Sequence, residues 1–349
     1  MKQYKVSLNH SGREFLVRED ESVLQGALRQ EVMLPYSCKN GTCASCKGRL
    51  LEGHIHYPFH PPLALDRKEL DQHQALFCQA AALSDLRIEV REIEAIRDIP
   101  VRTMPARVMA KELLSKDVMR LTLRLPKTMR MQFLAGQYID ILLPGNKRRA
   151  FSIASPPHEE DQIELHIRHV EGGDFTGFVF YELKEKSILR LEGPLGTFFV
   201  RNDQPRRPMI MMGGGTGFAP LKSMIEYLLR KKNTRPIDLY WGVRDEQELY
   251  MKELPEQWAV DHQHIRYIPA LTDPAEPETW RGRTGLIHQV VLADHQDLAS
   301  HDVYMSGPPM MIEAARHEFL ANDLPESRLF YDSFEFGADV PVDVLAEPH

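Results

Sequence analysis

The sequence contains few cysteines, no long apolar run and no excess of basic residues, and each absence excludes a class of protein. Only 4 of its 349 residues are cysteine, which excludes the dense disulfide framework of a small secreted domain. No stretch of about 18 consecutive apolar residues occurs, so we expect no membrane span. No apolar signal-peptide core follows the first residues, which alternate polar and apolar as a strand does. We therefore expect a cytoplasmic protein in a reducing compartment.

The charge and the composition narrow the class further. The formal net charge of -7 at pH 7 and the absence of a long Lys/Arg run argue against a nucleic-acid partner. Hydrophobic residues make up 43% of the chain, as in a globular protein. A chain of 349 residues is too long for one ordinary core, and we expect three domains.

The four cysteines have the spacing of a metal site. Three of them follow a C-x4-C-x2-C pattern and the fourth comes after 31 further residues; they are Cys38, Cys43, Cys46 and Cys78. This is the spacing with which plant-type ferredoxins bind a 2Fe-2S cluster. The intervening residues are small, and Gly41 can adopt the positive φ that a tight loop requires. Zinc ribbons use two C-x2-C pairs, so a zinc site is the weaker alternative.

The pattern of apolar residues divides the chain into three segments and a tail. Residues 1–95 open with strand-like stretches around a short helix, and prolines place a linker at 99–105. Residues 101–203 carry short strands between Pro and Gly turns, typical of an antiparallel barrel. Residues 205–335 alternate strands with helices, which indicates a parallel α/β sheet. We expect residues 336–349 to be a loose tail.

Two turns in the third segment join a strand to a helix. The first is rich in glycine, and backbone N–H groups at such a helix start can hold a pyrophosphate. Its candidate nucleotide-binding residues are Gly213, Gly214, Gly215, Thr216, Gly217 and Pro220. A glycine-rich turn without function is the alternative. The second turn is Ser306-Gly307-Pro308-Pro309.

Several of these motifs resemble known families. Residues 34–48 closely resemble the cluster loop of plant-type ferredoxins, which implies a β-grasp fold for the first segment. Arg149-Ala150-Phe151-Ser152 resembles the R-x-Y/F-S motif of the ferredoxin-NADP reductase superfamily. In that family the Arg neutralises the flavin phosphate, the aromatic packs beside the flavin ring and the Ser hydrogen-bonds near flavin N5. An exposed strand end is the alternative for these four residues.

Other segments extend the resemblance to the same superfamily. The family's second flavin strand and its pyrophosphate-binding turn are matched by His166, Ile167, Arg168, Gly173 and Thr176. The family's C-G-P-P element beside the nicotinamide is matched by Ser306, Gly307 and Pro308, with Ser306 in place of the usual Cys. The closing segment of the family, in which an aromatic covers the flavin ring, is matched by residues 331–334. The resemblance thus implies catalytic roles for Ser152, Ser306 and Phe334, although an ordinary core Phe is the alternative for the last.

Together the three segments resemble bacterial reductase components built from a ferredoxin domain, an FAD-binding barrel and an NAD-binding domain. This resemblance implies an NAD(P)H-dependent oxidoreductase with FAD and a 2Fe-2S cluster as cofactors. Electrons would leave the cluster for a separate acceptor protein, either an oxygenase component or an iron-sulfur sugar dehydrase. The alternatives are a redox sensor, a general NAD(P)H:flavin or ferredoxin reductase, and a structural zinc protein.

Two further expectations concern specificity. Asp245 and Glu246 follow the second strand of the third segment, where acids repel a 2'-phosphate and favour NADH, whereas Arg244 favours NADPH. Around the cysteines we expect a basic collar that steers an acidic acceptor, formed by Lys39, Lys47 and Arg49. A solvated face without a partner is the alternative reading of this collar.

Overall fold

The computed structural model describes residues 2–59, 61–62, 64–159, 161–202, 204, 206–275 and 279–334. Its internal contacts separate two units, one ending at Pro100 and the other beginning at Val101, and each is described here by itself. The expected tail at 336–349 lies outside the described residues. Of the helices in the described part, none is long and apolar enough to cross a membrane.

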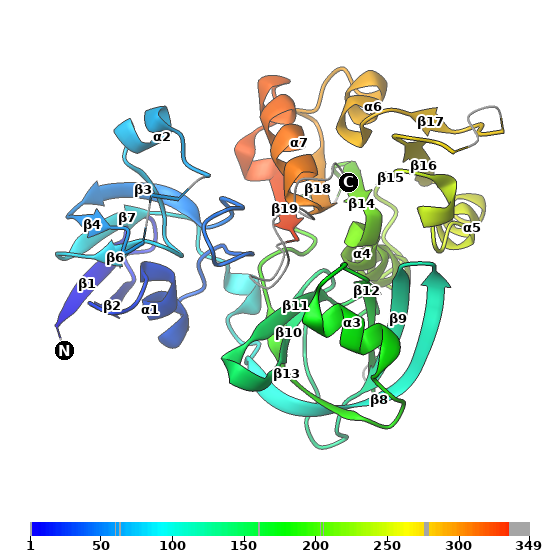
Figure 1. Cartoon of the computed structure of the whole chain (residues 1–349). Coiled ribbons are helices and arrows are strands. Elements are labelled where there is room, and N and C mark those ends of the chain that lie inside the picture. Colours follow the sequence, from blue (N-terminus) through cyan, green and yellow to red (C-terminus); the bar gives the residue numbers. More distant parts are fainter. Residues whose placement is uncertain are drawn as a thin grey trace. The chain divides into compact units, whose positions relative to one another are not determined.

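The first unit is a mixed sheet covered by a helix. Its main elements are β1 Gln3–Leu8, β2 Glu14–Arg18, α1 Val23–Arg29, β3 Lys47–Glu52, β4 Ile55–His56, α2 Arg67–Asp71, β5 Gln74–Leu76, β6 Ala81–Ala82, β7 Leu86–Glu89 and the 3-10 helix η1 Glu94–Ile96. The main sheet has the order β2-β1-β7-β3-β5, with β1 and β7 parallel and the other neighbours antiparallel. Such a sheet crossed by one helix is the expected β-grasp arrangement (Figure 1).

Helix α1 shows why the local sequence folds as it does. Ser22 accepts a hydrogen bond from the backbone N–H of Gln25, and the Gln25 side chain accepts one from the backbone of Ser22. This capping box starts the helix where the periodicity begins. Val23, Leu24 and Ala27 then point into the core of the unit. The sequence predicted β1, β2, α1 and β7 but not the short strands β3 to β6.

The second unit begins with an antiparallel barrel. Its elements are β8 Arg102–Ser115, β9 Val118–Arg124, β10 Tyr138–Leu142, η2 Pro144–Asn146, β11 Arg148–Ser152, β12 Gln162–Arg168, α3 Asp174–Tyr181 and β13 Ile188–Leu195. The sheet has the order β11-β10-β13-β8-β9-β12. A bridge between Ile153 and Leu165 brings its two edge strands together.

The linker expected at 99–105 is wrong in its second half. Strand β8 already begins at Arg102 and runs through Pro105. There β8 pairs only with β13, since its pairing with β9 starts at Arg107. One side of the strand is therefore open at Pro105, where a residue without an N–H does no harm.

A parallel α/β sheet completes the second unit. Its elements are β14 Met209–Gly214, η3 Gly215–Gly217, α4 Phe218–Arg230, β15 Ile237–Val243, η4 Glu246–Glu248, α5 Glu253–Asp261, β16 Ile265–Leu271, β17 Arg283–Thr284, α6 Ile287–Asp294, β18 Asp302–Gly307, α7 Pro309–Ala321, η5 Glu326–Arg328 and β19 Leu329–Ser333. All neighbours in the order β17-β16-β15-β14-β18-β19 are parallel. The described sheet is buried on both faces: α4 and α5 pack on one side and α6 and α7 on the other (Figure 1).

The strand order of this sheet reverses between β14 and β18. From β14 the chain proceeds to β15, β16 and β17 on one side, and then returns to β18 and β19 on the other. Ligands of open parallel sheets bind beyond the carboxyl ends of the strands at such a reversal. The glycine-rich turn and the Ser306 turn follow these two strands, and the fold therefore brings both to one place.

Candidate redox sites

The cysteine loop brings its thiols together in two pairs. The backbone N–H of Cys38 lies 3.5 Å from Cys43 Sγ, and that of Cys43 lies 3.4 Å from Cys38 Sγ. The N–H of Cys78 lies 3.4 Å from Cys46 Sγ. The loop that achieves this has positive φ at Gly41, as expected, and also at Lys39 and Ala44. Non-glycine residues in this region store strain that is typical of functional loops.

The electrostatics of the first thiol pair favour one thiolate, that of Cys38. The hydrogen bond from Cys43 lowers the pKa of Cys38 to about 5. The same hydrogen bond, with burial, raises the pKa of Cys43, and the contact with Cys78 raises that of Cys46. The first pair therefore shares one proton at neutral pH. Iron displaces such protons because the thiolate is its ligand.

Two thiol pairs suit a cluster with two irons better than one zinc ion. Cys38 is paired with Cys43, and Cys46 with Cys78. Each pair can hold one iron of a 2Fe-2S cluster. The donor set and its arrangement thus fit the cluster that the spacing predicts.

The flavin motif lies on β11, an edge strand of the barrel. Arg149 is half-buried, Ala150 is exposed and Ser152 is buried. The ring of Phe151 lies 5.6 Å from that of Phe175 in α3. An edge strand leaves this surface open to a ligand.

The second flavin strand is β12, whose side chains alternate between two surroundings. Ile167 is fully buried in the barrel core, so only its main chain could contact a cofactor. Glu164, His166 and Arg168 point the other way. Helix α3 follows, with Gly173 at its start and no side chain capping it, while Thr176 is hydrogen-bonded to Val170 in the preceding turn. The first turn carries Asp174, so only its backbone N–H groups could hold an anion.

The glycine-rich turn and the Ser306 turn approach each other closely. Gly213 pairs with Ser306 across β14 and β18. A Cβ on Gly217 would lie 2.0 Å from the Ser306 carbonyl oxygen, and one on Gly214 would lie 2.9 Å from Cδ of Pro308. Thr216 lies in the turn η3, and Pro220 in the first turn of α4. The glycines are therefore needed for contact between the two turns.

Two buried polar atoms at this place have no partner within the described residues. They are Ser306 Oγ and Nη2 of Arg168. The Arg168 guanidinium lies against the glycine-rich turn, with Nη2 3.2 Å from the position of a Cβ on Gly215. Buried polar groups are rarely left unsatisfied, and a polar ligand such as a dinucleotide would supply the missing partners. The residues present therefore fit a nicotinamide coenzyme.

Sequence reasoning missed Asp332 as a site residue. Its carboxylate accepts a hydrogen bond of 3.2 Å from Ser152 Oγ, and both residues are buried. Asp332 also pairs with Ser306 across β18 and β19. The backbone N–H of Phe334, a half-buried residue, donates to the Gly307 carbonyl. The structure thus brings Ser152, Ser306 and Phe334 to one region. The sequence signal that could have identified Asp332 is its position, an acid at the end of the last parallel strand.

Family comparisons agree with this architecture. The 2Fe-2S iron-sulfur cluster binding domain matches residues 6–83, the oxidoreductase FAD-binding domain matches 105–200, and the oxidoreductase NAD-binding domain matches 211–317. The protein is an oxidoreductase with a 2Fe-2S cluster, FAD and a nicotinamide coenzyme. The fold class and the cofactors predicted from the sequence are confirmed.

The chain belongs to the family of three-domain iron-sulfur flavoprotein reductases. It is 39% identical over 329 residues to the CDP-6-deoxy-L-threo-D-glycero-4-hexulose-3-dehydrase reductase of Yersinia pestis, covering 94% of this chain and 98% of the relative. It is also 39% identical over 342 residues to DmpP, the reductase component of phenol 2-monooxygenase from a Pseudomonas species, covering 96% of each chain.

Solved structures show the same fold over nearly the whole chain. The reductase GcoB of Amycolatopsis has a TM-score of 0.76 at 30% identity, covering 95% of this chain and 98% of that one. The ferredoxin reductase in carbazole 1,9a-dioxygenase has a TM-score of 0.69 at 29% identity, covering 96% and 99%. The predicted membership of this family is confirmed.

Proposed function

We propose that this protein passes electrons from NADH through FAD and the 2Fe-2S cluster to a separate acceptor protein. The observation that carries the proposal is the presence of two redox sites in one chain. The first unit holds two thiol pairs, and in the second unit Ser152 of the flavin motif is hydrogen-bonded to Asp332 of the nucleotide domain. Relatives named as reductase components of a phenol monooxygenase and a hexulose dehydrase support such an acceptor. It is an oxygenase component or an iron-sulfur sugar dehydrase. We also propose a cytoplasmic location, since iron-binding thiols need a reducing compartment.

The domain limits and site residues follow the sequence motifs. We propose a ferredoxin domain at 1–95, an FAD-binding barrel at 101–203 and a nucleotide domain at 205–335. When bound, FAD would supply the link between the two-electron hydride of the nicotinamide and the one-electron chemistry of the cluster. Arg149 would bind the flavin phosphate, and the backbone N–H groups at the start of α3 would bind the pyrophosphate. The glycine-rich turn and Arg168 would hold the coenzyme pyrophosphate.

Ser152 and Asp332 are proposed to act as one unit at the flavin. The Asp332 carboxylate accepts the hydrogen bond of Ser152 Oγ at 3.2 Å, so this oxygen could still accept a hydrogen bond from a flavin N–H. Ser306 lies opposite Asp332 in the next strand. Because Ser306 Oγ is buried without a partner in the described residues, it is free to hydrogen-bond to the nicotinamide.

NADH is the proposed coenzyme because Arg244, the cation beside the two acids, is itself paired with a carboxylate. Nε of Arg244 lies 3.1 Å from Glu248, which also pairs with Arg168 at 3.3 Å. A hydrogen bond from the backbone of Ala275 lowers the pKa of Asp245, so this acid stays charged and repels a 2'-phosphate. Comparison of kcat/KM for NADH and NADPH tests the assignment, and a clear NADPH preference would contradict it.

The basic collar around the cluster is weaker than the sequence suggested. Lys47 forms an ion pair of 3.1 Å with Glu69, and both side chains are largely buried. Lys39 lies over the ring of Tyr36 at 5.0 Å. Arg49 is exposed on β3. Charge reversal at Lys47 would thus repel Glu69, and Arg49→Glu is the cleaner test of an acidic docking partner.

The order of the redox centres is tested by Cys43→Ser. The variant should lose the cluster absorbance and the reduction of a protein acceptor, while FAD binding and NADH-to-ferricyanide activity remain. Ser45→Ala, beside the same sulfur at 3.4 Å, keeps all four thiols and should retain the cluster. A loss of ferricyanide reduction by Cys43→Ser in a folded protein would show that the cluster precedes the flavin.

A further inference from the structure

Three alternate residues of β12 reach from the barrel to the nucleotide domain. Because side chains of a strand alternate, Ile163, Leu165 and Ile167 fill the barrel core and Glu164, His166 and Arg168 share the opposite face. Each of these three has a partner in the nucleotide domain: Glu164 pairs with Lys222, His166 with Tyr250, and Arg168 with Glu248. One strand therefore builds both the flavin barrel and its contact with the coenzyme domain.

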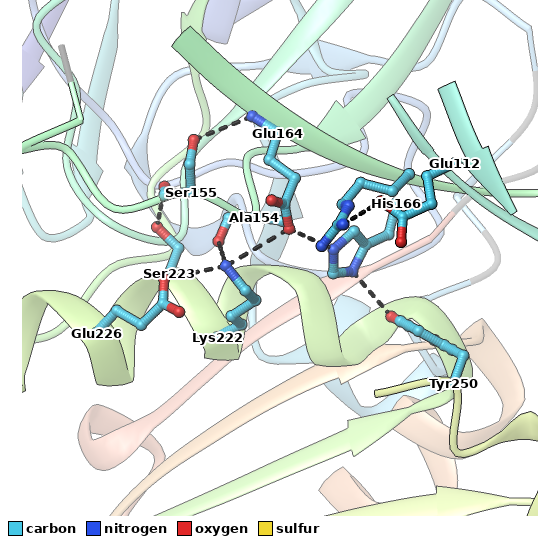
Figure 2. Close-up of polar contacts among 10 residues, drawn as sticks. Glu112, Ala154, Ser155, Glu164, His166, Lys222, Ser223, Glu226 and Tyr250 are labelled. Atoms are coloured by element: carbon cyan, nitrogen blue, oxygen red, sulfur yellow. Dashed lines mark hydrogen bonds and ion pairs between the residues drawn. The ribbon is translucent and has the colours of Figure 1, made fainter. Parts of the chain in front are cut away.

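His166 forms the centre of this contact. Its ring is completely buried, with Nε2 at 2.7 Å from Glu164 Oε1 and Nδ1 at 3.0 Å from the Tyr250 hydroxyl (Figure 2). Burial lowers the pKa of His166, so the ring is neutral. A carboxylate can only accept, and so Nε2 carries the hydrogen and Nδ1 accepts from Tyr250. The histidine side chain is thus fully engaged and would not bind a flavin phosphate.

Lys222 of α4 adds a second set of contacts. Its buried ammonium lies 3.4 Å from Glu164, 3.0 Å from Glu226 and 3.3 Å from the Ala154 carbonyl (Figure 2). The next residue, Ser223, donates a hydrogen bond of 2.7 Å to the Ser155 carbonyl. Ala154 and Ser155 come two and three residues after Ser152, the last residue of the flavin motif. Helix α4, which begins at the glycine-rich turn, is thereby tied to both flavin strands.

Tyr250 links the same contacts to the glycine-rich turn. Its ring packs edge-on against Trp241 at 5.1 Å, and Trp241 donates a hydrogen bond of 2.9 Å to the Gly215 carbonyl. A displacement of Tyr250 would therefore be transmitted to the turn that binds the coenzyme. We call Glu164, His166, Lys222 and Tyr250 the polar seam.

The composition of the polar seam indicates its role. A buried ion pair is often no more stabilising than well-packed apolar residues, so stability alone does not explain these groups. Directional hydrogen bonds allow one alignment of the two domains, whereas an apolar surface can slide. Hydride transfer is sensitive to such alignment, and a misplacement of about 1 Å can slow a reaction by about 100-fold.

We propose that the polar seam positions the nucleotide domain against the flavin strands for hydride transfer. The seam residues are positioning residues, since their side chains act through α4 and the glycine-rich turn. This inference rests on the proposed NADH-to-flavin reaction and adds the residues that set its geometry.

The test compares two buried tyrosines of the nucleotide domain. Tyr250→Phe removes the hydroxyl that crosses to His166, whereas Tyr240→Phe removes one that donates to Asp294 within the domain at 3.1 Å. Both variants keep the ring, and the purified holoenzymes are mixed anaerobically with NADH. We expect Tyr250→Phe to reduce flavin about tenfold more slowly at saturating NADH, with the NADH Kd changed less than twofold. The long-wavelength absorbance that reports nicotinamide stacking on the flavin should weaken, and Tyr240→Phe should match the wild type.

The results separate the inference from the function on which it rests. If the wild type does not reduce its flavin with NADH or NADPH, the proposed function fails. If it does and Tyr250→Phe behaves like Tyr240→Phe, the positioning role is wrong. A slower rate that is fully restored by raising NADH, with unchanged stacking absorbance, would also overturn it. His166→Gln, which can still donate and accept, should retain more of the rate than His166→Leu, and Ser223→Ala serves as a second variant should Tyr250→Phe not fold.

Discussion

Alanine substitutions at two glycines of the second unit should have opposite effects. Gly217 has helical angles, with φ -58 and ψ -14, so an alanine meets no backbone strain there. Its Cβ would nevertheless lie 2.0 Å from the Ser306 oxygen, and an ordinary contact begins at 3.4 Å. The two turns must therefore separate by about 1.4 Å. Such overpacking lowers the free energy of unfolding by about 1–3 kcal/mol. Because the atom that the new Cβ meets belongs to the backbone and cannot rotate away, we expect the top of this range.

Gly177 is the matched control. It lies within α3, and a Cβ there would meet nothing within 4 Å. Alanine should stabilise this helix by about 0.5–1 kcal/mol. Denaturation in excess FAD can be followed by tryptophan fluorescence, because all 3 tryptophans, Trp241, Trp258 and Trp280, lie in the nucleotide domain. Gly217→Ala should also weaken NADH binding. Equal stability of the two variants would refute the close approach as the reason for this glycine.

Three further predictions concern flavin binding, stability and pH. Arg149→Ala should purify with substoichiometric FAD and normal iron, and full flavin occupancy would remove Arg149 from the site. Asp302→Asn removes the carboxylate that pairs with the buried Arg235 at 2.6 Å. The free energy of unfolding should fall by about 3–5 kcal/mol, and a fall of less than about 1 kcal/mol would contradict this. Burial lowers the pKa of His166 from 6.5. Below about pH 6.5 the unfolded chain therefore binds a proton that the folded chain does not. As the pH falls, the free energy of unfolding should decrease by up to about 1.4 kcal/mol per pH unit. The charged and titratable groups facing this ring are Glu164, Tyr250, Lys222 and Arg120. His166→Gln should flatten this slope in denaturation measured from pH 7 to 5, and an unchanged slope would assign the acid sensitivity to other groups.

The sequence predicted the features that local patterns encode. The cysteine spacing, the glycine-rich turn and the Arg149–Ser152 motif each lie within a few residues, and the structure gives each the expected strand, loop or helix start. The change from alternating strands to strand-helix units was also visible in the sequence. Strands buried on one face alternate polar and apolar residues, whereas strands buried on both faces form short apolar runs between helices. Short strands such as β4 and β6, two residues each, are too short to show a period.

The residues that the sequence did not reveal act through distant contacts. Ser152 and Asp332 are 180 positions apart, and Lys222 is 68 positions from Ala154. Lys222 is buried in α4, although a lysine in a sequence is normally expected on the surface. His166 was matched to the flavin strand because that strand is visible in the sequence, whereas its partner Tyr250, 84 positions away, is not. Pairing across domains has no local signature in one sequence.

The boundary at Pro100 has a consequence for exchanging acceptors. Internal contacts separate the residues before it from those after it, whereas the polar seam joins barrel and coenzyme domain through buried charges. A cut between residues 202 and 206 would separate Glu164 from Lys222 and leave each buried charge without its partner. A chimera that replaces only the ferredoxin part, joined at Pro100 and Val101, would leave those charges paired. An exchange of the ferredoxin part at this boundary would therefore leave every contact of the polar seam within one chain segment.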